Sequence, residues 1–245
     1  FSGKNLSIDI TEGPGWGKGN VGIRAGYVDS SSATQSTINL GNKGKTESIS
    51  VKVTDNSGVG DVAIGIWAEG NVANKGGVIN INTKSLVVDV TTKTWAYGLY
   101  SQNRTTTSTS DLSTININAD DIYINATTTG SSEKGHSANA IVAQSQGVMN
   151  INGNLEAHAT SAAISTRGAS TIKINEDGLH STKLYGNIDF NYDKGTSGTV
   201  ADATVIVNFS GSDSIWVGNS SVSYGTGKPS DQSYLDVLVQ FGNLR

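Results

Sequence analysis

A pattern of three short segments recurs five times along this chain, and it limits the possible folds more than any other feature. The first segment alternates apolar with variable residues and ends in threonine: Leu6–Thr11, Ile49–Thr54, Leu86–Thr91, Ile122–Thr127 and Leu155–Thr160. The second reads small, aliphatic, variable, small: Gly22–Ala25, Gly65–Ala68, Gly98–Ser101, Ala140–Ala143 and Ala163–Thr166. The third reads apolar, polar, apolar, then asparagine or glycine: Ile38–Gly41, Ile79–Asn82, Ile115–Asn118, Met149–Asn152 and Ile172–Asn175.

This repeat predicts an all-β chain folded as a parallel β-helix with three sheets. Alternation with a period of two indicates strands. The closing threonines of the first segment lie 43, 37, 36 and 33 residues apart, as expected for a constant core joined by loops of variable length. Gly or Asn at the end of each third segment is expected to provide the positive φ of a corner. A β-sandwich, the alternative, gives no reason for a three-strand pattern to recur.

The composition fits a narrow, uncharged solenoid. Hydrophobic residues make up 36% and charged residues 16%, against roughly 45–50% and 25% in ordinary globular domains. A net charge of −4 without a Lys/Arg run argues against nucleic-acid binding. The absence of cysteine excludes disulfides and thiolate chemistry. No stretch approaches the ~20 apolar residues of a membrane helix. Because no signal peptide opens the chain, we expect a fragment of a longer protein.

The variable position of the second segment predicts a ligand-binding ladder. Its residues are Arg24, Trp67, Tyr100, Val142 and Ser165, and they should point outward if the neighbouring aliphatic residues point inward. The longest loops are expected beside the early copies. Trp16 lies in the Gly-rich part of one loop, and Lys18 and Arg104 are candidate rim charges. The predicted ligand-binding residues are Trp16, Lys18, Arg24, Trp67, Tyr100 and Arg104. Alternatively, a loop covers the aromatic residues and makes a satellite core.

Other polar residues are interpreted as structural. Asn39, Asn80, Asn116 and Asn150 occupy equivalent positions and are expected to pair their amides from coil to coil. Asp9, Lys52, Asp89, Asn125 and His158 form a mixed ladder rather than an acidic cluster, and the three histidines show no metal spacing. We therefore predict no enzyme activity, catalytic residue, metal site or cofactor.

The C-terminal part resembles a known family. Asn208–Ser220 reads Asn-Phe-Ser-Gly-Ser-Asp-Ser-Ile-Trp-Val-Gly-Asn-Ser, and this resembles the strand–turn–strand near the C-terminal end of type V autotransporter passenger domains. The resemblance implies a right-handed parallel β-helix, exported through the outer membrane of a Gram-negative bacterium and displayed or released. Residues 1–177 would then form five coils with protruding loops. Residues 178–245 would form the final coils and the transition toward a C-terminal cap, which Leu238–Asn243 would open.

The resemblance and the missing catalytic motifs favour an adhesin. The expected partner is a host extracellular-matrix or cell-surface protein or glycan, bound at the loops and ladder of the early coils. One alternative is self-association with a copy on a neighbouring cell, which promotes aggregation or biofilm formation. Others are a glycan-cleaving β-helix enzyme and a passive stalk.

Overall fold

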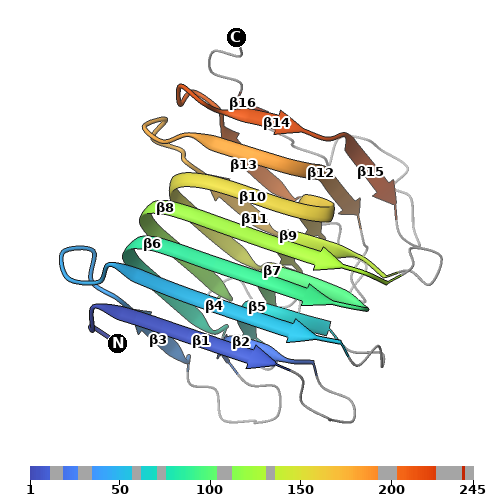
Figure 1. Ribbon diagram of the computed structural model, residues 1–245. Helices are drawn as coiled ribbons and strands as arrows, with labels where there is room; N and C mark the ends of the chain where they lie inside the picture. The colour runs from blue at the N-terminus through green and yellow to red at the C-terminus, as the bar shows by residue number, and fades with distance from the viewer. Residues whose placement is uncertain are drawn as a thin grey trace.

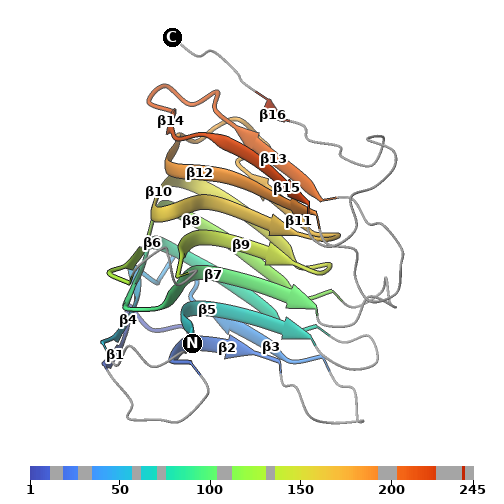
Figure 2. The same ribbon diagram turned by 90° about the vertical axis from the view of Figure 1, so that its right-hand side faces the viewer.

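The chain folds as a parallel β-helix, as the repeat predicts (Figure 1). The computed structural model describes residues 1–11, 19–26, 35–56, 62–70, 76–103, 112–130, 136–192, 203–224 and 239–240. Each coil runs along three sheets in turn, and the coils rise in a right-handed sense from the N-terminus (Figures 1 and 2). Most residues of the predicted loops, including Trp16, Lys18 and Arg104, lie outside the described residues. Within the described ranges, no helix is long and apolar enough to cross a membrane.

Each of the three repeated segments supplies one sheet. The first sheet contains β1 (Asn5–Thr11), β4 (Ser48–Asp55), the ends of β6 (Val78–Thr92) and β8 (Thr114–Thr128), the middle of β10 (Val148–Arg167), the start of β12 (Thr182–Tyr192) and β14 (Ile215–Val217). The second contains β2 (Val21–Ala25), β5 (Val62–Gly70), β7 (Trp95–Asn103), β9 (Ala138–Gln144), the ends of β10 and β12, and β15 (Ser220–Tyr224). The third contains β3 (Thr37–Leu40), the starts of β6, β8 and β10, then β11 (Thr171–Ile174), β13 (Thr204–Asn208) and β16 (Val239–Gln240).

The register confirms that equivalent residues of successive copies stack. Ile49 pairs with Leu86, Ile66 with Leu99, and Ile79 with Ile115. These six side chains are fully buried. They belong to one hydrophobic cluster that extends from Ile23 to Phe209 along the inside of the coils. The low apolar content is therefore sufficient, because each coil only has to fill a thin layer.

The second segment begins with a small residue for a steric reason. A Cβ atom at Gly22 would collide with Val51, one at Gly65 with Val88, and one at Gly98 with Ile124. The second sheet thus approaches the first so closely at this level that the backbone itself fills the space.

The prediction for the corners after the third segment is partly wrong. Gly41 and Asn175 have positive φ values of 80° and 52°, as expected, but Asn82, Asn118 and Asn152 are not among the described residues with positive φ. At these corners the strand continues, so that β6, β8 and β10 each run from the third sheet into the first. Gly153, directly after Asn152, has a φ of 145° at a register shift, whereas β6 and β8 pass the corner without one. All three asparagines keep their side chains on the outer surface.

The coils continue beyond Asn175, where the repeat becomes irregular. Strand β12 follows β10 with a register shift near Gly186, which has a φ of 136°. The stretch from Asn208 to Ser220 forms the predicted strand, turn and strand. Phe209 is 1% exposed, and Trp216 Nε1 donates a hydrogen bond of 3.1 Å to the Gly186 carbonyl. Of the predicted cap opening, only β16 lies within the described residues.

Candidate functional site

The predicted ladder lies on the outer face of the second sheet. Arg24 pairs with Trp67 and Trp67 with Tyr100, as the repeat predicts. The Arg24 guanidinium carbon lies 4.2 Å from the centre of the Trp67 ring. The Trp67 and Tyr100 rings stack with centroids 5.7 Å apart and an interplanar angle of 29°. The three side chains therefore form a continuous cation–aromatic column.

Part of this column is packed in a small cluster outside the main core, as in the alternative of a satellite core. Tyr100 is only 8% exposed, and its hydroxyl donates a 3.0 Å hydrogen bond to Gln144 Oε1. A second hydrophobic cluster surrounds it on the outside of the sheet, made of Val21, Val62, Ile64, Trp67, Tyr97, Tyr100 and Val142. Burial raises the pKa of Tyr97, and the positive charge of Arg167 opposes this increase. The ligand-binding role of the column remains a prediction.

The charge of Arg24 is already paired. Its Nη2 atom forms a short ion pair with Oε2 of Glu69, whose side chain is completely buried. Within the described part of the chain, Arg24 Nε and Trp67 Nε1 are buried donors without a hydrogen-bond partner. The column therefore offers a ligand no free positive charge at Arg24, and its two unpaired N–H groups are buried.

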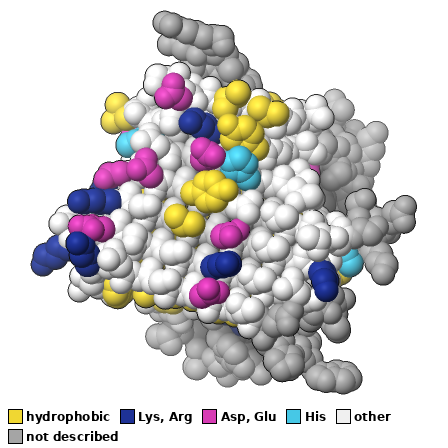
Figure 3. All heavy atoms as spheres, in the orientation of Figure 1, with side chains coloured by type: hydrophobic (Ala, Val, Ile, Leu, Met, Phe, Trp, Pro, Cys, Tyr) yellow, Lys and Arg dark blue, Asp and Glu magenta, His cyan; other side chains and the backbone are white. Residues whose placement is uncertain are grey.

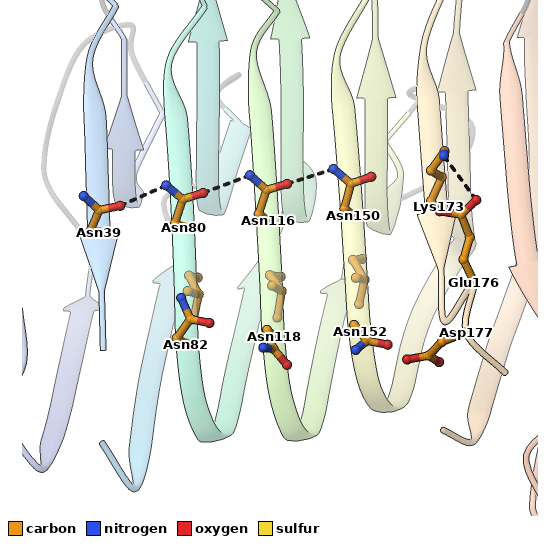
Figure 4. Close-up of a pocket in the computed structure, with 13 residues that line it drawn as sticks. Asn39, Asn80, Asn82, Asn116, Asn118, Asn150, Asn152, Lys173, Glu176 and Asp177 are labelled. Atoms are coloured by element: carbon orange, nitrogen blue, oxygen red, sulfur yellow. Dashed lines mark hydrogen bonds and ion pairs between the residues drawn. The ribbon is translucent and has the colours of Figure 1, made fainter. Parts of the chain in front are cut away.

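A groove with a volume of about 510 Å³ runs along the outer face of the third sheet (Figure 4). Its inner row consists of Asn39, Asn80, Asn116 and Asn150, one from each of four coils. Their amides form the predicted ladder. Each Nδ2 donates to Oδ1 of the preceding coil, at 2.9 Å for Asn80 and 2.8 Å for both Asn116 and Asn150.

A second row of asparagines lines the groove beside the inner row. This corner row, Asn82, Asn118 and Asn152, consists of the residues at which the strands pass the corner (Figure 4). Charged residues lie at one end of the groove, where Lys173 and Glu176 form a 3.1 Å ion pair next to Asp177. At its side, Lys43 pairs with Asp120 at 3.0 Å and donates to Asn118 Oδ1 at 3.3 Å.

A third feature, an aromatic ridge, lies on the outer face of the first sheet. It consists of Tyr123, His158 and Tyr185, and Figure 3 shows the hydrophobic and histidine side chains that gather on this face. The His158 and Tyr185 rings stack at 4.3 Å with an angle of 11°, and Tyr123 lies 5.6 Å from His158. His158 Nε2 is 2.7 Å from Glu156 Oε1.

The ridge continues into apolar residues of β14. Ile215 is 42% exposed, Val217 53% and Tyr123 39%. Partial burial raises the pKa of Tyr123, and the negative charges of Asp89 and Glu156 raise it further. Sequence reasoning placed His158 in a mixed ladder and missed both tyrosines. The available signal was the apolar alternation of Leu184–Phe190, which aligns Tyr185 with His158.

The mixed charge ladder is present as predicted. Asp9 pairs with Lys52 and Lys52 with Asp89 across β1, β4 and β6. Asn125 Nδ2 donates to Asp89 Oδ1 at 2.8 Å. In the described ranges, no three His, Cys, Asp or Glu residues form a group that could hold a metal ion.

The three outer faces thus offer three surfaces of different chemistry.

No protein-family model, curated protein or solved structure matches this chain.

Proposed function

We propose that this chain is the binding module of an adhesin, displayed on the surface of a Gram-negative bacterium as an autotransporter passenger. Its partner is a protein or glycan of a host or neighbouring cell. The observation that supports this proposal is the stacking of outward side chains in register on every face of the β-helix. The strand–turn–strand of Asn208–Ser220, which resembles the end of such passengers, supports the localisation.

A rigid β-helix is suited to binding without catalysis. Its outer side chains stand on strands whose inner residues are packed in one continuous core, so that little conformational entropy is lost when a partner is bound. Equivalent residues recur at about 4.8 Å from coil to coil. A partner with several contact points can therefore be bound by many modest interactions at once.

The adhesin function is tested by applying the labelled chain to cultured cells, matrix proteins and a glycan array. We expect saturable binding that falls at least about fivefold (roughly 1 kcal/mol) in the loop variant Trp16→Ala/Lys18→Ala/Arg104→Ala. Lys84→Ala, which removes an exposed charge where β6 passes from the third sheet to the first, is the control. Equal binding by parent and loop variant would refute the early-coil site, and a parent that binds nothing would refute the adhesin function.

A second candidate is self-association through the first sheet. The observation that favours it is the exposed apolar ridge beside the alternating charges of Asp9, Lys52 and Asp89, because an exposed apolar patch with complementary charges is typical of an interface between copies. Sedimentation analysis should then show dimers or larger species that dissociate in Ile215→Lys/Val217→Lys. Clumping of cells that display the parent, without host cells, is the corresponding observation on bacteria.

A further inference from the structure

We propose that the asparagine-lined groove of the third sheet binds a linear, uncharged polysaccharide that lies along the helix axis. This inference rests on the adhesin function and names a ligand class and a site for it. The groove extends over four coils, and its inner and corner rows contribute seven asparagine side chains to its lining.

The groove offers a regular array of unused hydrogen-bonding groups. A primary amide can donate two hydrogen bonds and accept two. Within the inner row, the amides of Asn80 and Asn116 each give one donor and one acceptor to the ladder, so each keeps a second N–H and a second lone pair. In the described part of the chain, the Asn82 and Asn152 side chains make no hydrogen bond at all. The amide ladder of the inner row therefore does not explain why asparagine occupies the positions of the corner row.

The inner row is also held in place before any ligand arrives. Hydrogen bonds of 2.8–2.9 Å fix the rotation of the inner amides. The strands that carry them are anchored by Ile79, Ile115 and Met149, which are fully buried beneath the inner row. Side chains fixed in this way lose little entropy on binding, which favours affinity from many weak contacts.

The chemistry of the lining selects a neutral polyhydroxylated chain. Hydroxyl groups of sugars donate and accept hydrogen bonds, as amides do. The residues of β3, β6, β8 and β10 that line the groove include no charged and no aromatic side chain. An anionic glycan or a nucleic acid would need unpaired cations or stacking platforms, whereas Lys173 and Lys43 are both paired with carboxylates.

The repeat of the protein presents the same pair of asparagine positions at successive coils. Because the asparagines recur once per coil at about 4.8 Å, successive sugar units can make the same contacts at successive coils. Contacts of this kind add along the chain, so affinity should grow with ligand length. Four coils span about 14 Å between the first and last asparagine of the inner row, and affinity should level off once the ligand covers that length.

The test is calorimetric titration of the whole chain with a graded series of neutral linear glucan and mannan oligosaccharides, from the disaccharide upward. We expect affinity to rise with length and then level off. Asn82→Ala/Asn152→Ala should weaken the longest ligands about tenfold (about 1.4 kcal/mol) without lowering the unfolding temperature. Asn5→Ala/Asn125→Ala removes two asparagines from the first sheet and should bind like the parent.

Several results would overturn the groove site. The first is that no neutral oligosaccharide binds, or that the parent and Asn82→Ala/Asn152→Ala bind with equal affinity. The second is that Asn82→Ala/Asn152→Ala and Asn5→Ala/Asn125→Ala lose equal affinity. The third is a preference for sulfated chains, uronate chains or extended peptides over neutral glycans. Cell and matrix-protein binding, measured in parallel, separates this failure from failure of the adhesin function. A chain that adheres to cells but ignores neutral glycans refutes the groove proposal alone, whereas a chain that binds neither refutes both.

Discussion

Arg24 and Asn82 both lie on the outside of the β-helix, but they differ in what they can offer a ligand. The Arg24 guanidinium contacts the Trp67 ring and pairs with the buried Glu69 carboxylate. The Asn82 amide has no hydrogen-bond partner among the described residues and faces the groove. Residue type alone favours Arg24 as a binding residue, whereas the contacts favour Asn82.

Single glycines of the second sheet should be intolerant of any side chain. In Gly65→Ala the new methyl group would collide with Val88 and with the Gly98 carbonyl, and we expect a loss of about 1–3 kcal/mol in the free energy of unfolding. Gly44→Ala is the control, because its methyl group would meet only Asn42 Oδ1 at 3.5 Å. Urea denaturation of both variants measures the difference. Similar stabilities for the two would contradict the close approach of the sheets.

The buried phenol of Tyr97 should make stability depend on alkaline pH. Burial raises its pKa in the folded chain, so the unfolded chain releases this proton first. The free energy of unfolding is therefore unaffected well below pH ~10 and decreases as the pH rises above that value. Tyr97→Phe should make this decrease smaller, as measured by urea denaturation at a series of pH values. An unchanged slope would show that Tyr97 does not carry the effect.

At the scale of elements, the strands could be predicted from the sequence, but the corners could not. Inward residues such as Ile66 and Leu99 repeat because each fills an equivalent place in a thin core. The corner asparagines look like turn residues, since asparagine tolerates a positive φ. Only Asn175 adopts one of the expected turns, while Asn82 continues an extended strand. The groove could not be predicted because it depends on this difference.

The contacts of the aromatic ridge also could not be predicted from the repeat alone. Tyr123 and His158 belong to adjacent columns of the first sheet, so their contact depends on the register between β8 and β10 as well as on the repeat. Tyr185 joins them from β12, where the pattern has become irregular. By contrast, the column of Arg24, Trp67 and Tyr100 was predictable, because each occupies the same position in its copy.

The two rows of the groove should contribute differently to stability. Asn116→Ala breaks two hydrogen bonds of 2.8 Å, to Asn80 and from Asn150, and should lower the free energy of unfolding by about 1–2 kcal/mol. Asn82→Ala, on a neighbouring strand, breaks none and should change it by less than about 0.5 kcal/mol. Thermal and urea denaturation compare the two. If Asn82→Ala were as destabilising as Asn116→Ala, the corner row would have a structural role.

At the scale of the whole molecule, the coils stack on one continuous central core. Ile124 lies in its middle and is fully buried, whereas Ile8 lies on β1 and is only partly buried. We expect Ile124→Ala to cost about 2–5 kcal/mol and Ile8→Ala clearly less, because β1 pairs only with β4 among the described strands. Urea denaturation measures both, and equal losses would contradict a core built coil upon coil.

The stacking of coils also determines how this chain reaches its fold. Contacts between neighbouring coils join residues far apart in sequence; the amide ladder, for example, joins positions 41, 36 and 34 residues apart. Closing the first such loop costs chain entropy before any ladder of hydrogen bonds can repay it. Once two coils have formed, each later coil pairs with the exposed strand edges of the coil before it and closes one loop at a time. Folding should therefore begin with a slow nucleation step and then propagate along the axis by the addition of one coil after another.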